Sequence, residues 1–82
     1  MEIEERIKKL CEKIIDEKTT EEEKKEYASE IARILRDEKD GLLLRWVEKE
    51  VQKKYPEICI EAVKQNVNAL RHVPEEVKKD QK

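Results

Sequence analysis

Apolar residues recur along this chain at the spacing of one face of an α-helix, from the N-terminus to about residue 72. No stretch alternates apolar and polar residues with the period of a β-strand. The 82 residues include one glycine and two prolines, which leaves little material for the tight turns that a sheet requires. The sequence therefore predicts an all-α fold, built as a compact bundle of four amphipathic helices.

Capping and breaking residues set the expected helix boundaries. Thr20 followed by Glu23 is the pattern of a capping box, and Asp40 suits the start of a new helix. Pro56 and Pro74 each end the preceding helix, because proline lacks the amide that continues the hydrogen-bond ladder. We expect helices over about residues 2–17, 21–38, 42–54 and 57–72, and no internal repeat is evident.

The four helices are expected to form one small domain. Residues 1–73 make up this single helical domain, and residues 74–82 a short charged turn or tail. The chain contains no phenylalanine, so its core must be built from isoleucine, valine and leucine. Such a core is thin for a domain of this length, which favours self-association or docking on a partner.

Charged residues make up 49% of the chain, yet the net charge is only −2. This composition, rich in lysine, glutamate and isoleucine, is typical of thermophile proteins and of designed helical proteins. No apolar run exceeds residues 42–44, so we expect no membrane span, and the acidic start of the chain lacks the apolar run of a signal peptide. We therefore expect a cytoplasmic protein whose two cysteines, Cys11 and Cys59, are free thiols.

The residue types that catalysis needs are scarce, since the chain has one histidine, one serine and two cysteines. Cys59 and His72 are thirteen residues apart, which is about 20 Å along one continuous helix, too far for a nucleophile–base pair or a shared metal. Cys11 with His72 stays geometrically open. The sequence has no zinc-binding spacing and no glycine-rich phosphate loop. We expect a protein that is not an enzyme, with no catalytic residue, cofactor or metal.

One helix is apolar on two sides. The main stripe of the helix over 42–54 consists of Leu43, Leu44, Val47 and Val51, and Leu42 and Trp46 fall on another side. A second apolar side favours contact with a partner, and tryptophan is enriched among the residues that dominate interfaces. The sequence thus favours a non-catalytic helical module that binds another protein or its own copy through Leu42 and Trp46.

Residues 47–70 read VEKEVQKKYPEICIEAVKQNVNAL, a helix, a short turn that ends in proline, and a second helix. This segment resembles the helix-turn-helix of winged-helix regulators of the ferric-uptake-regulator type. Val63, Asn66, Val67 and Leu70 fit the pattern of that family's recognition helix. The resemblance covers about 24 of the 82 residues.

The resemblance implies DNA binding as an alternative function, with residues 57–72 as the recognition helix. That helix would enter the major groove and offer Lys64, Gln65, Asn68 and Arg71 to the bases, with Lys53 and Lys54 on the DNA backbone. The second half of the chain is the basic one, with 9 Lys/Arg against 7 Asp/Glu in residues 42–82. A third alternative is a helical scaffold, orphan or designed, without intrinsic activity.

Overall fold

The computed structural model describes residues 2–79, and every regular element in this range is a helix. The elements are α1 (Glu2–Ile15), α2 (Glu21–Glu38), the 3₁₀-helix η1 (Gly41–Trp46), α3 (Lys49–Lys54), α4 (Pro56–Gln65), the 3₁₀-helix η2 (Val67–His72) and α5 (Glu75–Lys79). The predicted all-α fold class is confirmed. None of the helices within residues 2–79 combines the length and the apolar character that a membrane crossing needs.

The first two helices form where their stripes and caps predict them. The Thr20 hydroxyl accepts from the Glu23 amide at 3.2 Å, and the Glu23 carboxylate accepts from the Thr20 amide at 3.1 Å, so the capping box is complete. Helix α2 ends at Lys39, whose left-handed backbone (φ 52°) lets its amide donate to the carbonyl oxygens of the last helical turn. The predicted bounds 21–38 are confirmed, and α1 ends two residues before the predicted residue 17.

The prediction of one continuous helix over residues 42–54 is wrong. The Asp40 side chain accepts from the Leu42 amide at 3.1 Å and starts the short helix η1. Val47 then has extended backbone (φ −88°, ψ 126°), which suits a β-branched residue, and it separates η1 from α3. The segment is therefore two short helices with a bend between them.

The prediction of one continuous helix over residues 57–72 is wrong for a similar reason. Asn66 has extended backbone (φ −158°, ψ 114°), and its side-chain oxygen accepts from the Asn68 amide at 2.9 Å. An asparagine side chain competes with the helix for backbone donors, so it favours a cap over a helix interior. Helix α4 ends at Gln65, and η2 begins after the break.

The two 3₁₀-helices open two copies of the same structural unit. Each copy begins with an Asx cap at Asp40 or Asn66, passes through an extended valine at Val47 or Val73, and continues into a short α-helix. The copies are offset by 26 residues, a repeat that the sequence pattern did not reveal. Over residues 40–53 and 66–79, six of fourteen aligned pairs are identical, namely Leu44/Leu70, Arg45/Arg71, Val47/Val73, Glu50/Glu76, Val51/Val77 and Lys53/Lys79.

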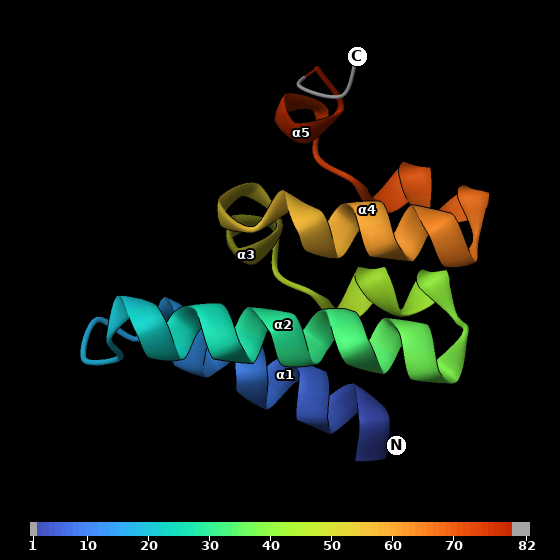
Figure 1. Ribbon diagram of the computed structural model, residues 1–82. Coiled ribbons are helices and arrows are strands. Elements are labelled where there is room, and N and C mark those ends of the chain that lie inside the picture. The colour runs from blue at the N-terminus through green and yellow to red at the C-terminus, as the bar shows by residue number, and fades with distance from the viewer. Residues whose placement is uncertain (1, 80–82) are drawn as a thin grey trace.

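The repeated units lie in successive layers. Helix α4 packs on α2 and runs in the same direction, while η2 packs on η1 (Figure 1). Helix α1 covers the opposite side of α2, so that α1, α2 and α4 follow one another across the molecule (Figure 1). The molecule is a slab of 33 × 29 × 15 Å around one apolar cluster.

The last helix belongs to the core of the domain. Helix α5 lies where the sequence predicted a charged turn or tail over residues 74–82. Pro74 and Val77 are buried, and α5 packs on α3. The core thus extends past residue 73, and the part of the predicted tail at residues 80–82 lies outside the described residues.

Gly41 allows the two layers to meet closely at one point. A Cβ atom at Gly41 would overlap the Ala62 carbonyl oxygen and would lie 3.0 Å from the Asn66 amide nitrogen, both at the end of α4. These are backbone atoms of a packed helix, so they cannot move aside as a flexible side chain would. Position 41 therefore requires glycine for steric reasons, because any side chain would keep η1 from contacting α4.

We expect Gly41→Ala to lower the free energy of unfolding by about 1–3 kcal/mol, the usual cost of forcing extra atoms into a packed site. Val67 occupies the equivalent position of the second unit and is 65% exposed, so Val67→Ala should change stability by less than about 0.5 kcal/mol. Urea unfolding followed by circular dichroism measures both variants. A Gly41→Ala protein as stable as the parent would contradict the close approach of the layers.

Candidate functional site

The two repeated units enclose a hollow of about 460 Å³, which lies between η1 and α3 on one side and η2 and α5 on the other. Its charged walls carry four cations and one carboxylate, which are Arg45, Lys49, Arg71, Lys78 and Glu75. The hollow therefore has a formal charge of 4 − 1 = +3 with His72 neutral, whereas the whole chain has −2. This is a local concentration of positive charge in an acidic protein.

The repeat itself brings the two arginines of the hollow together. Arg45 and Arg71 occupy the same position in the two units, each two residues before the extended valine. Both are exposed, and both line the hollow. Among the described residues, none of the four cations of the hollow forms an ion pair with a carboxylate. Their charges are therefore available to a ligand.

The floor of the hollow is apolar and buried. It consists of Val47, Val73 and Pro74, all of which are buried. An ion pair also links α3 to α5, the helices on the two sides of the hollow, with Lys53 Nζ 2.9 Å from a Glu76 carboxylate oxygen. Cationic walls above an apolar floor suit a ligand that carries both negative charge and apolar groups.

A buried amide fixes the wall that η1 and α3 share. Gln52 is 2% exposed, and its Nε2 donates to the carbonyl oxygens of Val47 at 2.9 Å and Leu44 at 3.4 Å. Its Oε1 accepts from Cys59 Sγ at 3.3 Å. Three hydrogen bonds thus join the end of η1 to α3 and α4 on this side of the hollow.

The two cysteines are enclosed thiols. Burial raises the pKa of the Cys59 thiol to about 11, and burial also raises the pKa of Cys11. A thiol that stays protonated near neutral pH is a poor nucleophile. The sequence predicted Cys59 and His72 on one continuous helix. They lie on different helices, because α4 ends at Gln65. The absence of catalysis stays a prediction.

The two residues predicted as a protein interface do not form a pair. Side chains three apart lie one above the other on a 3₁₀-helix, so Trp46 shares its side with Leu43, whereas Leu42 aligns with Arg45. Trp46 is half-buried against the core, and Lys8 Nζ and Arg45 Cζ each lie 5.0 Å from its ring centroid. The indole borders a second hollow of about 370 Å³ that also includes Arg45 and Lys49.

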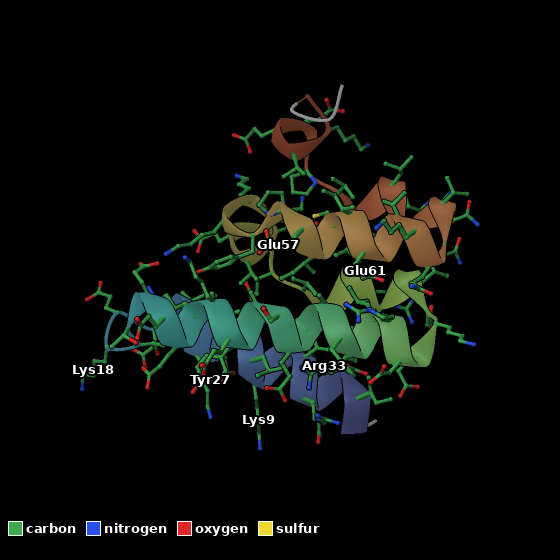
Figure 2. The ribbon with its side chains drawn as sticks, in the orientation of Figure 1. Lys9, Lys18, Tyr27, Arg33, Glu57 and Glu61 are labelled. Atoms are coloured by element: carbon green, nitrogen blue, oxygen red, sulfur yellow. The ribbon has the colours of Figure 1, made fainter. Side chains whose placement is uncertain are left out.

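The residues predicted to contact DNA are dispersed. Lys53 and Lys54 are in ion pairs with Glu76 and Glu21. Gln65 donates to the Glu61 carboxylate at 2.9 Å, on the side of α4 that faces α2 (Figure 2). Lys64 lies exposed on α4, while Asn68 and Arg71 lie on η2, beyond the break at Asn66. Of the six, only Arg71 lines the basic hollow.

Sequence reasoning missed Arg45, Lys49 and Lys78 as members of one site. They are up to 33 residues apart in the chain, and only the stacking of the two units brings them together. A signal was present in the paired motifs Leu44-Arg45-x-Val47 and Leu70-Arg71-x-Val73. Aligning them would have revealed the repeat.

We expect Gln52→Leu to lower the free energy of unfolding by about 1–3 kcal/mol, because it leaves a buried carbonyl group without its donor. Gln65→Leu makes the same chemical change at a partly exposed position, where water can replace the lost partner, and should cost less than about 0.5 kcal/mol. Denaturant unfolding measures both. Equal stability of the two variants would contradict the role given to Gln52.

Comparison with protein families finds a match over half of the chain. The family described as Domain of unknown function (DUF4116) matches residues 38–78, which is 41 of 82 residues. The matched segment begins at the end of α2 and contains η1, α3, α4, η2 and most of α5. It includes the described residues that line the hollow. No curated protein and no solved structure matches the chain. The chain belongs to the family described as Domain of unknown function (DUF4116).

Proposed function

We propose that the protein is a non-catalytic helical interaction module that binds a second copy of itself through the uncovered end of its layered stack. The observation that carries this proposal is a pair of exposed apolar side chains on η2. Val67 is 65% exposed and Leu70 is 37% exposed. They are three residues apart on a 3₁₀-helix, so they lie on one side of it.

The equivalent positions of the first unit indicate what such a surface does. Gly41 and Leu44 occupy these positions on η1, and there α4 of the next layer covers them, so that Leu44 has no exposed area. On η2 no further layer of the described residues covers Val67 and Leu70. Equivalent residues are thus buried in the first unit and exposed in the second. In repeat proteins such exposed positions are where a further repeat would pack.

A second copy supplies a suitable cover. A twofold contact places the same apolar patch on both partners, so each patch removes the other from water. The thin core of the chain makes this additional apolar burial valuable to its stability. Leu42 and Trp46, the contacts favoured by the sequence, stay predictions, and the same experiment tests Trp46.

The DNA-binding alternative has less support in this arrangement. Its recognition helix over residues 57–72 is broken at Asn66, and its two backbone lysines on α3 are already paired with carboxylates. DNA affinity depends mainly on free cations that neutralise phosphates. No specific observation favours the third alternative, a helical scaffold without intrinsic activity.

Sedimentation velocity from micromolar to millimolar concentration tests self-association. We expect the parent chain to show a sedimentation coefficient that rises with concentration, and Leu70→Glu to raise the dissociation constant by about tenfold or more, since it places a charge in the apolar contact. Trp46→Ala should leave association unchanged if the contact lies on η2.

Ile15→Glu is the matched control, because Ile15 is 42% exposed but lies on α1, where it borders a hollow lined by α2 and α3 and not by η2. It should associate like the parent. A parent chain that stays monomeric at millimolar concentration overturns self-association. If Trp46→Ala abolishes association and Leu70→Glu does not, the contact lies at Trp46, as the sequence favoured, and not on η2.

A further inference from the structure

We infer that the hollow between the two repeated units binds an acidic peptide segment of a partner protein, with Arg45 and Arg71 as its carboxylate-binding residues. This inference rests on the proposed function as an interaction module, and it assigns a ligand chemistry to a surface distinct from the apolar end of the stack. It concerns the hollow of about 460 Å³ described above.

The first argument is charge. The hollow concentrates a formal charge of +3 in a chain whose net charge is −2, and its four cations make no ion pair with the described carboxylates. By contrast, the neighbouring Lys53 and Lys54 are both paired. What distinguishes the four cations of the hollow is that they line one cavity together, so an anionic ligand could contact several of them at once.

The second argument is the kind of cation. Arginine presents a planar fork of N–H groups that matches a carboxylate with two parallel hydrogen bonds. The repeat places one arginine from each unit, Arg45 and Arg71, in the same hollow. The two guanidinium groups can bind two carboxylates of one peptide segment. This favours a segment with suitably spaced acidic residues over other anions.

The third argument is the floor, which favours a peptide over a nucleic acid. Val47, Val73 and Pro74 offer an apolar base on which an aliphatic side chain of a peptide can rest. Glu75 on the wall would repel a continuous phosphate backbone, whereas a peptide can place an uncharged residue there. A segment in which acidic and aliphatic residues alternate satisfies both features.

The test uses fluorescence anisotropy with the full chain and a fluorescein-labelled peptide that alternates glutamate with leucine. We expect saturable binding that weakens as NaCl is raised from about 50 to about 300 mM. A peptide with glutamine in place of glutamate should bind at least about tenfold more weakly, since it keeps the size and loses the charge. Equal binding of the two peptides would overturn the inference.

The variant R45E/R71E changes the net charge from −2 to −6 and should weaken binding by at least about tenfold. The matched control is K9E/K18E, which makes the same change in net charge on exposed residues at the α1 side of the molecule, away from α5 (Figure 2). The control should bind within about twofold of the parent. If the control loses as much affinity as R45E/R71E, overall charge explains the binding and the proposed site is wrong.

Arg45 also contacts the Trp46 ring, so its replacement could alter packing as well as charge. The single variant R71E is therefore measured too, and circular dichroism checks that each variant is folded.

A labelled single-stranded oligonucleotide is the competing probe. If it binds more tightly than the acidic peptide and R45E/R71E removes that binding, the ligand is a nucleic acid and the inference is overturned. If neither probe binds while the chain still self-associates through Leu70, the acidic ligand is wrong and the interaction module stands. If peptide binding follows the arginines but the chain stays monomeric, the hollow is supported and self-association is not.

Discussion

The buried amide of Gln52 joins the bend of the first unit to α4, the helix that leads into the second unit. A chain that leaves the helical path at Val47 buries the carbonyl groups that end η1, and each buried carbonyl without a donor is costly. Gln52 supplies donors to these groups and binds Cys59 of α4 through its oxygen. The bend after η1 is thereby stable, and α3 can turn the chain so that α4 returns over α2 (Figure 1).

The parts of the fold that depend on local signals were predictable from the sequence. Helix α2 carries a complete capping box and a regular apolar stripe, and its predicted bounds are those observed. The breaks at Val47 and Asn66 depend on contacts that a stripe does not encode. At Val47 the partner is Gln52, five residues later, and at Asn66 the side chain caps its own turn. Both segments have helical spacing, so periodicity alone merged each with its neighbour.

The candidate site was less predictable, because it is made by stacking. The sequence singled out Arg71 for its place on an expected recognition helix, but in the structure it lines the same hollow as Arg45 of the preceding unit. The repeat that joins them is obscured by substitutions in the aligned positions, such as Leu42 with Asn68 and Trp46 with His72. The apolar pattern therefore differs between the two units, while the capped start and the extended valine recur in both.

Val67 stands where the first unit has Gly41, and this exchange limits how far the layers can be extended. The glycine lets the end of α4 descend onto η1, whereas the branched side chain of valine holds an approaching helix at a greater distance. An array that adds layers without closing grows into filaments, and every step of such growth needs the same close approach. Under the proposed self-association, Val67 would therefore act against open-ended growth, because each further layer would need the close approach that Gly41 permits and valine does not.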